Sequence, residues 1–297
     1  MRSLTGRLIR RRPLAERKRT YAEVLREGVR RLAGIPDGEL DARLLLEEVC
    51  GTDLTTLLAA PETPVGEAAA QAYFGYIARR ENREPLAYII GHQEFMGLPF
   101  LVDRNVLIPN PDTETLAELA LSYLSPGMRI LDLCTGSGCI LLSLLKRSPE
   151  TSGAGTDLSA AALAVAEGNR EALGLHERAV FWEGDLFAAV PAGTEPFDII
   201  VSNPPYIAEG VIGTLEDEVR VHEPHMALSG GTDGLAFYRR ILKDAPRYLK
   251  AGGMALLEIG YDQEEAVTAM LRGHGFADVR VTKDFNGLPR VVSGRKA

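Results

Sequence analysis

The sequence predicts an α/β fold, in which a mostly parallel β-sheet has helices on both faces and a small helical domain precedes it. After Asp112, short apolar runs alternate with amphipathic stretches, which is typical of parallel strands joined by helical crossovers. From Thr20 to Glu84, apolar residues recur at helical spacing. A chain of 297 residues that is 45% hydrophobic can bury a core in each of two domains.

Four segments follow from these patterns. Residues 1–19 are expected to be a basic flexible lead-in, because Glu16 is their single acidic residue among many arginines. An organelle-targeting segment is the alternative, but the stretch is not rich in serine and Pro13 interrupts it. Residues 20–84 are the helical domain, residues 85–111 a hairpin linker, and residues 112–297 the sheet domain.

The helical domain has clear start and stop signals. Thr20–Glu23 fits a capping box, Gly51 can end a helix over Asp41–Cys50, and a longer helix is expected over Glu67–Arg80. The glycines and aromatics of Tyr88–Val102 then predict a hairpin.

The sheet domain contains six short apolar runs and one weaker candidate strand. The weaker one, Thr151–Thr156, is poor in residues that favour strands. The six runs are Arg129–Leu133, Ala179–Trp182, Phe197–Val201, Met254–Ile259, Asp278–Val281 and Pro289–Val292.

Composition argues against several classes of protein. The net charge of -8 disfavours sequence-blind binding of nucleic acid, and no apolar run has the length of a membrane span. Cys50, Cys134 and Cys139 are odd in number and lack CxxC spacing. They indicate a reducing, cytoplasmic setting rather than disulfides or a zinc site.

A glycine-rich loop, Asp132–Ile140 (DLCTGSGCI), follows the first strand of the sheet. Gly136 and Gly138 permit a tight turn and the close approach of a ligand to the backbone. A dinucleotide site would have a third glycine where this chain has Leu141, and no P-loop pattern is present. Asp132 places a carboxylate beside the loop, which suits a cationic cofactor better than a phosphate.

Two further carboxylates end the next strands. Asp157 can accept hydrogen bonds from the hydroxyls of a ribose, although it or Ser159 could instead cap a helix. Asp185 can accept from the amine of adenine, or it can simply form a Gly-Asp turn. In open α/β sheets, ligands bind beyond the carboxyl ends of the strands, so these residues and Asn203 should surround one pocket. Such a pocket suits S-adenosylmethionine (SAM), an adenosine that carries a sulfonium.

The fourth strand ends in Asn203–Tyr206 (NPPY), which resembles the signature of methyltransferases acting on an amino group bound to an sp² carbon. Such a nitrogen is a poor nucleophile because its lone pair is delocalised. The oxygens of Asn203 and Pro204 can each accept one N–H, which orients the nitrogen and stabilises positive charge. The two prolines fix the carbonyl direction, and the Tyr206 ring can pack on the flat acceptor.

The whole set of motifs, from Tyr21 to Val292, resembles the release-factor glutamine methyltransferases (the PrmC/HemK family). The segments that carry the resemblance are Glu84–Phe100, Val106–Glu114, Asp132–Gly138, Phe197–Ile207, Glu223–Leu235, Leu257–Gly260 and Lys283–Arg290. The resemblance implies a class I SAM-dependent methyltransferase domain (Rossmann-like, with a seven-stranded mostly parallel sheet) behind a helical substrate-recognition domain.

The implied activity is methylation of the side-chain amide nitrogen, N5, of the glutamine in the Gly-Gly-Gln (GGQ) motif of class 1 peptide chain release factors. SAM is the implied cofactor and S-adenosylhomocysteine the product. The expected enzyme is a cytoplasmic monomer that takes part in translation termination and binds no metal, membrane or nucleic-acid substrate.

The resemblance also assigns residues by position. Those implied to bind the cofactor are Asp132, Cys134, Thr135, Gly136, Ser137, Gly138, Asp157, Leu158, Asp185, Leu186 and Asn203. Those implied to hold the glutamine are Asn203, Pro204, Pro205, Tyr206, Glu94, Phe95 and Phe100, with Asn203, Pro204 and Tyr206 as the catalytic group.

Three positions depart from the family pattern. Cys134 replaces a glycine, Asn110 replaces an arginine, and Leu186 stands where some relatives have an aromatic residue. Since none of them changes NPPY, activity is expected to survive. The alternatives are an amino-methyltransferase acting on a base in DNA or rRNA, and a factor-binding protein without turnover.

Other conspicuous residues have structural explanations. His222 and His225 look like a metal pair, but Pro224 breaks the helix that would place both rings on one face. Cys139 is expected to pack behind the glycine loop, and Glu258 to form part of the pocket wall.

Overall fold

The structure is a computed structural model that describes residues 18–297, so residues 1–17 of the predicted basic lead-in lie outside the described residues. The chain forms two compact units that divide between Leu86 and Ala87. None of the helices in residues 18–297 combines the length and apolar content that a membrane span requires.

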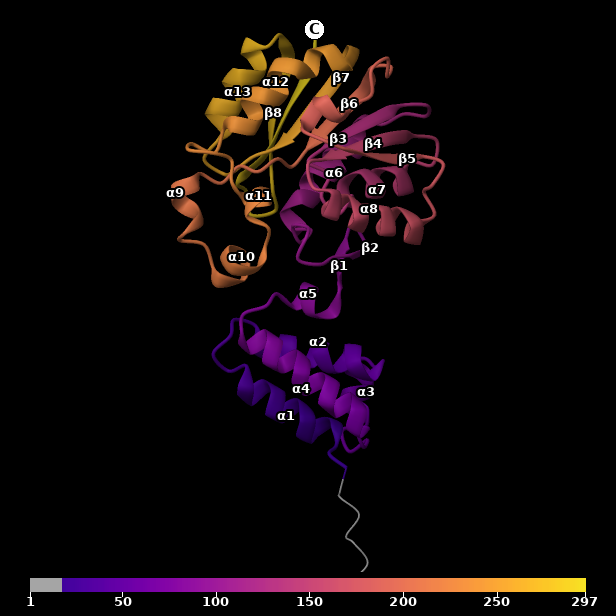
Figure 1. Cartoon of the computed structure of the whole chain (residues 1–297), viewed down its shortest axis with the longest axis vertical. Helices are drawn as coiled ribbons and strands as arrows, with labels where there is room; N and C mark the ends of the chain where they lie inside the picture. The colour runs from indigo at the N-terminus through magenta and orange to yellow at the C-terminus, as the bar shows by residue number, and fades with distance from the viewer. Residues whose placement is uncertain (1–17) are drawn as a thin grey trace, which may run out of the picture. The chain divides into compact units, whose positions relative to one another are not determined.

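The N-terminal unit contains four helices that Figure 1 labels α1 to α4. The expected capping box is confirmed, because Glu23 N donates to Thr20 Oγ1 at 3.4 Å and Thr20 N donates to Glu23 Oε2 at 3.0 Å. Gly51 is left-handed and ends the second helix, as predicted. The bounds are α1 (Tyr21–Arg31), α2 (Gly38–Cys50), α3 (Leu54–Ala59) and α4 (Glu67–Glu81).

The predicted hairpin is shorter than expected, because its first residues form the helix α5 (Leu86–Ile90). Gly91 N donates to Ala87 O, and the buried Tyr88 donates its hydroxyl to Val106 O. Those contacts hold this apolar turn as a helix. The hairpin itself pairs β1 (His92–Phe95) with β2 (Leu98–Leu101).

The second unit is built on the predicted sheet, whose seven strands in the described chain have the order β5-β4-β3-β6-β7-β9-β8. β3, β4, β5, β6 and β7 all run parallel to one another, whereas β9 is antiparallel to both β7 and β8. The bounds are β3 (Arg129–Leu133), β4 (Ser152–Asp157), β5 (Ala179–Glu183), β6 (Phe197–Ser202), β7 (Leu249–Glu258), β8 (Phe276–Lys283) and β9 (Pro289–Lys296).

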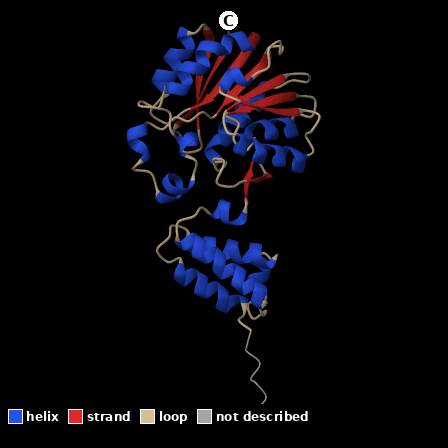
Figure 2. Cartoon of the chain, viewed as in Figure 1, coloured by secondary structure: helices blue, strands red, loops and turns tan. Residues whose placement is uncertain are grey.

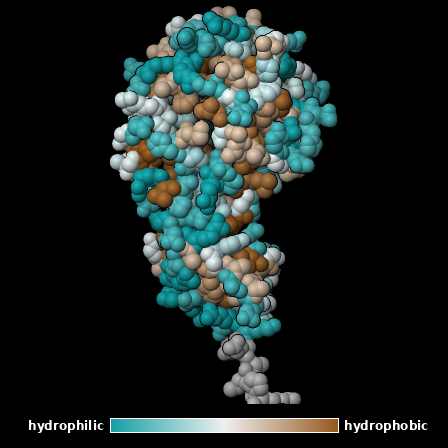
Figure 3. Space-filling view, in the orientation of Figure 1, coloured by the Kyte–Doolittle hydropathy of each residue, from teal (hydrophilic) through white to brown (hydrophobic). Residues whose placement is uncertain are grey.

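Helices cover both faces of this sheet (Figure 2). Successive residues of β3 point to opposite faces, so Ile130 joins one apolar cluster with α6 and α7, while Leu131 joins another with α12 and α13. On the face that Figure 3 shows, hydrophilic and hydrophobic residues are interspersed. The helices are α6 (Pro111–Tyr123), α7 (Cys139–Arg147), α8 (Ala160–Leu173), the 3₁₀ helix η1 (Leu186–Ala189), α9 (Glu209–Ile212), α10 (Asp217–His222), α11 (His225–Leu228), α12 (Ala236–Tyr248) and α13 (Glu264–Gly273).

The weakest predicted strand forms β4, and its glycines have a packing role. A Cβ on Gly153 would lie 2.6 Å from Leu141 Cδ1, and one on Gly155 would lie 2.7 Å from both Phe181 Cδ1 and Thr135 Oγ1. Neighbouring side chains occupy the space where larger residues would stand. Close packing has therefore overridden the low strand propensity of this segment.

We expect Gly155→Ala to lower the free energy of unfolding by about 2 kcal/mol, because the added methyl overlaps Phe181 and Thr135. Gly273→Ala is the matched control, since a Cβ there meets no atom of the described residues within 4 Å. In a helix this change should be neutral or stabilising by up to about 1 kcal/mol. Urea unfolding measures both, and equal effects of the two variants would contradict the packing explanation.

Candidate active site

A cavity of about 210 Å³ lies where four parallel strands end. Its wall includes the residues that directly follow β3, β4, β5 and β6. The chain runs from β3 outward to β5 and then returns to the other side of β3 as β6. This reversal of strand order leaves a crevice at the carboxyl ends of the strands, which is the usual ligand site of open α/β sheets.

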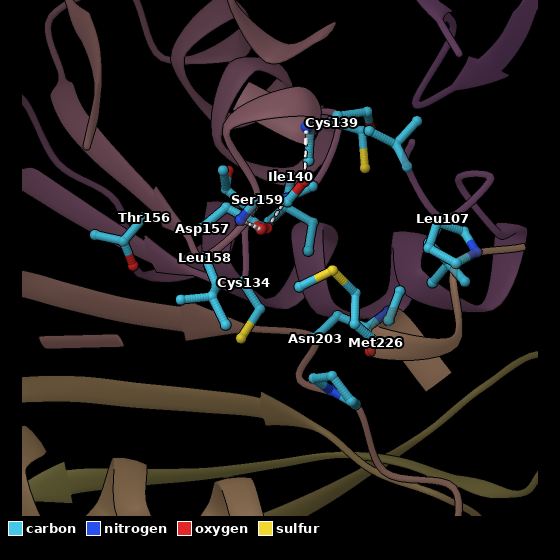
Figure 4. A pocket seen from close by; sticks show the side chains of 18 of the residues that line it. Leu107, Cys134, Cys139, Ile140, Thr156, Asp157, Leu158, Ser159, Asn203 and Met226 are labelled. Carbon is cyan, nitrogen blue, oxygen red and sulfur yellow. Dashed lines mark hydrogen bonds between the residues drawn. The ribbon is translucent and has the colours of Figure 1, made fainter. Parts of the chain in front are cut away.

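Most of the predicted site residues line this cavity. They are Cys134, Thr135, Gly136, Ser137, Asp157, Leu158, Asp185, Leu186, Asn203 and Pro205. Figure 4 shows several of them around the pocket, including Cys134, Asp157, Leu158 and Asn203. The structure therefore brings together residues from four strand ends that are far apart in the sequence.

The glycine loop turns sharply between β3 and α7. Gly136 and Gly138 have φ of 54° and 77°, and Cys134, which has a side chain, adopts φ of 59°. Thr135 N donates to Thr156 O at 3.0 Å, which ties the loop to β4. A side chain in this region of φ is strained by roughly 1–2 kcal/mol, so Cys134 stores strain at a position where the resemblance predicts glycine.

Asp157 holds the loop and the next helix at once. Its Oδ2 accepts from Gly136 N and its Oδ1 accepts from Ser159 N, both at 2.9 Å. Ser159 is the helix cap, because its hydroxyl oxygen accepts from Ala162 N at 3.1 Å. Burial raises the pKa of Asp157, and these backbone N–H groups oppose that rise. Each carboxylate oxygen still has a second lone pair for a ligand hydroxyl.

Asp132 lies behind the cavity wall. It is fully buried, and its Oδ2 accepts from Thr135 Oγ1 at 2.6 Å. Burial raises the pKa of Asp132 to about 7. Its contact with the cavity therefore runs through Thr135, which lines the wall.

Asp185 has a partner that the sequence did not reveal. Arg240 of α12 donates to Asp185 Oδ2 at 2.6 Å, and both side chains are about half exposed at the cavity. A ligand amine would therefore share this carboxylate with a guanidinium. Leu186 beside it is buried and adopts φ of 50°, the second strained side chain of the wall.

Asn203 stands at the end of β6 with its amide already engaged. Asn203 Nδ2 donates to Thr113 Oγ1 at 3.2 Å, whereas its Oδ1 accepts no hydrogen bond from the rest of residues 18–297. Tyr206 turns its hydroxyl inward, where it donates to Glu258 Oε1 at 3.4 Å. Burial raises the pKa of this phenol. Pro204 and Tyr206 are absent from the described cavity wall, which Pro205 reaches.

The hairpin residues predicted to close the pocket lie elsewhere. Phe95 and Phe100 are buried and pack edge to face, with ring centroids 6.2 Å apart, in the core that also holds α6 and α7. Glu94 is exposed on β1. The two rings fill the apolar layer beneath the hairpin and do not line the cavity, so the structure does not place them where they were predicted to contact the substrate.

Several wall residues were not predicted. They come from the loop before α6, from α11 and from α12, and include Ile108, Asn110, Met226, Phe237 and Arg240. The sequence pointed to the first two groups only indirectly, because they lie in Val106–Glu114 and Glu223–Leu235, two of the segments that carry the family resemblance. Asn110 also caps α6, since its Oδ1 accepts from Asp112 N at 2.9 Å.

His222, His225 and Cys139 have the expected structural places, whereas Glu258 is buried and is not part of the cavity wall as predicted. Pro224 separates α10 from α11, so His222 and His225 do not share one helix. Cys139 is buried at the start of α7. Across residues 18–297, no group of three or more His, Cys, Asp or Glu side chains is arranged to hold a metal ion.

The donor set of the wall fits an adenosine with a positively charged substituent. Leu158, Leu186 and Ile140 supply apolar surface, and Asp157 and Asp185 supply carboxylates. A Cβ on Gly136 would meet no atom of the described chain within 4 Å, so a ligand has room beside that backbone. The carboxylates of this wall would repel a phosphate, and Arg240 is already paired with one of them.

Fold and cavity together define a class I SAM-dependent methyltransferase. The PrmC N-terminal domain family matches residues 23–91, and the methyltransferase small domain family matches residues 112–219. The chain belongs to the release factor glutamine methyltransferase family. A protein of that name from Caulobacter vibrioides is 43% identical over 266 residues, which are 89% of this chain and 91% of the relative. One from Cereibacter sphaeroides is 45% identical over 276 residues, which are 92% and 98% of the two chains.

Solved structures share the fold at much lower identity. A methyltransferase from Pyrococcus furiosus is 17% identical with a TM-score of 0.51, covering 74% of this chain and 97% of its own. The hMettl16 catalytic domain is 16% identical with a TM-score of 0.54, covering 77% and 81%. These likenesses support the methyltransferase fold alone.

The two cysteines of the wall are expected to be unreactive. Burial raises the pKa of both thiols, that of Cys139 to about 12, and Asp157 and Asp132 also raise the pKa of Cys134. At pH 8, both should react with iodoacetamide more than a hundredfold slower in the folded than in the unfolded protein, because the thiolate is the nucleophile. The rate should rise about tenfold per pH unit. Mass spectrometry of labelled peptides measures this, and rapid labelling of folded Cys134 would contradict the predicted pKa shift.

Proposed function

We propose that this enzyme methylates the side-chain amide nitrogen, N5, of the glutamine in the Gly-Gly-Gln motif of class 1 peptide chain release factors. The observation that carries the proposal is the state of Asn203. Its Nδ2 is held by Thr113, and its Oδ1 accepts nothing from the described chain although Asn203 lines the cavity. A glutamine amide needs an acceptor of this kind for its N–H groups.

SAM, when bound, supplies the methyl group on a sulfonium, a centre that a weak nucleophile can attack. Asp157 would hold the ribose hydroxyls with its remaining lone pairs, while Gly136 would let the cofactor approach the loop backbone. Leu158 and Leu186 would cover the adenine. Asp185 would accept a hydrogen bond from the adenine amine while it retains its ion pair with Arg240.

On the substrate side, Asn203 and the corner that follows it would orient the glutamine. Asn203 Oδ1 and the Pro204 carbonyl would each accept one N–H of the amide, which aims the nitrogen at the cofactor. Both acceptors also stabilise the positive charge that develops as the nitrogen gains carbon. The methylated nitrogen releases one of its protons to solvent water, so the product amide is neutral.

Pro204 and Pro205 are both buried, which keeps the carbonyl direction fixed. Holding the nitrogen in line with the methyl supplies much of the catalysis, because the amide is a poor nucleophile in solution. Tyr206, whose hydroxyl donates to Glu258 Oε1, would pack its ring on the flat amide. The helical N-terminal unit would recognise the release factor.

Incubation with SAM and a purified class 1 release factor tests this proposal. We expect one added methyl group, located by fragment mass spectrometry on the glutamine of the Gly-Gly-Gln motif. A release factor in which that glutamine is replaced by asparagine serves as the substrate control. A wild-type enzyme that binds SAM but leaves the glutamine unmodified would overturn the proposal.

We expect Asn203→Ala to abolish measurable turnover while SAM affinity stays within about tenfold, since the lost oxygen serves the substrate amide. Asn286→Ala is the matched control, because Asn286 is exposed in the turn between β8 and β9 and away from the cavity wall. Single-turnover kinetics and calorimetry with SAM measure the two effects. An equal loss of SAM binding would show that Asn203 serves mainly the cofactor.

A further inference from the structure

An asparagine can present either an oxygen or an NH₂ group to a ligand, and the proposed function requires the oxygen of Asn203. The two orientations differ by a half-turn of the same side chain and occupy nearly the same space. Packing therefore distinguishes them poorly, and hydrogen bonds must decide. The neighbours of Asn203 show how this choice is made.

Thr113 is the neighbour that contacts the amide directly. It lies in the first turn of α6, is 3% exposed, and its Oγ1 is 3.2 Å from Asn203 Nδ2. A hydroxyl can accept from an NH₂ group or donate to a carbonyl oxygen, so Thr113 alone would tolerate both orientations. Something must therefore fix the direction of the hydroxyl proton.

Glu258 is the group in place to do so. It is 2% exposed at the end of β7, where Tyr206 Oη donates to its Oε1 and its Oε2 has no partner among the described residues. The Thr113 hydroxyl lies close enough to lower the pKa of this carboxyl. An ionised carboxylate attracts the positive end of a nearby hydroxyl dipole, so it favours the orientation in which the Thr113 proton faces Glu258. Thr113 Oγ1 is then left as an acceptor for Asn203 Nδ2.

We propose that Thr113 is a positioning residue which, held by Glu258, keeps Asn203 Oδ1 facing the substrate amide. The inference rests on the proposed function, and it adds two residues from outside the NPPY motif. Glu258 lies behind the cavity wall, whereas Thr113 lines the cavity beside Asn203 and contacts its amide. Glu258 also holds Tyr206 and thereby joins both ends of the corner.

The arrangement depends on the charge of Glu258. Burial raises the pKa of Glu258 to about 7, while Thr113, Arg290 and Tyr206 oppose the rise. Once protonated, the carboxyl can donate to Thr113, whose proton is then free to bond Asn203 Oδ1 and to turn the NH₂ group toward the cavity. The titratable and charged groups around Glu258 are Asp112 on α6, Cys139 on α7, Tyr206 after β6, Tyr238 on α12, and Arg290 on β9 with its partner Asp284.

Replacement of the hydroxyl tests Thr113. We expect Thr113→Val to lower kcat with a release factor by at least about tenfold while SAM affinity is unchanged, since the orienting bond is lost. Thr113→Ser keeps a hydroxyl and should restore most of the rate. Thr115→Val is the matched control, because Thr115 is a buried threonine of the same helix and Asn203 Nδ2 bonds to Thr113 instead. Equal rates for Thr113→Val and Thr115→Val would overturn the proposal.

Two further measurements separate orientation from a structural effect. The side-chain ¹⁵NH₂ signal of Asn203, assigned by its loss in Asn203→Ala, should be protected from exchange in the wild type and in Thr113→Ser but not in Thr113→Val. The kcat of the wild type should rise through one ionisation near pH 7, and Glu258→Gln should remove that step. A step retained in Glu258→Gln, or an Asn203 signal unaffected by Thr113→Val, would contradict the inference. The exchange measurement does not depend on turnover. If the wild-type enzyme were inactive on release factors, the proposed function would be refuted, and the exchange result alone would decide whether Thr113 orients Asn203.

Discussion

The parallel pairing of β3 with both β4 and β6 is the constraint on which the site depends. The register places Leu133 opposite Thr156 on one side and opposite Ser202 on the other. The glycine loop, Asp157 and Asn203 each begin one residue beyond these partners, so three chemically different groups arrive at the same edge. A slip of one residue would turn the whole strand over and remove its polar end from the crevice. Pairing register thus brings the glycine loop and the NPPY corner, which are far apart in the chain, to one edge of the sheet.

Beneath this edge lie two buried carboxyl groups, each near a threonine that lines the cavity. Asp132 holds Thr135 under the glycine loop, and Glu258 lies beside Thr113 under the NPPY corner. Burial raises the pKa of both carboxyls to about 7. Carboxyl groups out of reach of water have little freedom to move, so they can fix hydroxyl directions without contacting a ligand.

The sequence predicted the sheet, the helical domain, the glycine loop and the part of the cavity wall formed by the strand ends, because these follow from apolar periodicity and from residues that end strands. The prediction of β4 was weak because glycine has a low strand propensity. Gly153 and Gly155 are needed there because Leu141 and Phe181 pack against them, and these residues come close only in the folded chain. The start of the hairpin was wrong because the Tyr88 hydroxyl finds an acceptor at Val106, a contact that no local pattern reveals. Arg240 beside Asp185 and Thr113 beside Asn203 were missed for the same reason, since each pair joins distant segments. The contacts predicted for Phe95 and Phe100 came from resemblance, and their burial in the core gives those rings a packing role.

The central claim is that this NPPY corner serves a protein amide rather than a nucleic-acid base. A competition assay tests it most directly. The enzyme, methyl-labelled SAM, a class 1 release factor, ribosomal RNA and DNA are combined in one reaction, with each acceptor at the same concentration. The account predicts that label enters the release factor and resides on the glutamine of its Gly-Gly-Gln motif, with nucleic acid at background. Label in RNA or DNA, with the release factor unmodified, would contradict it.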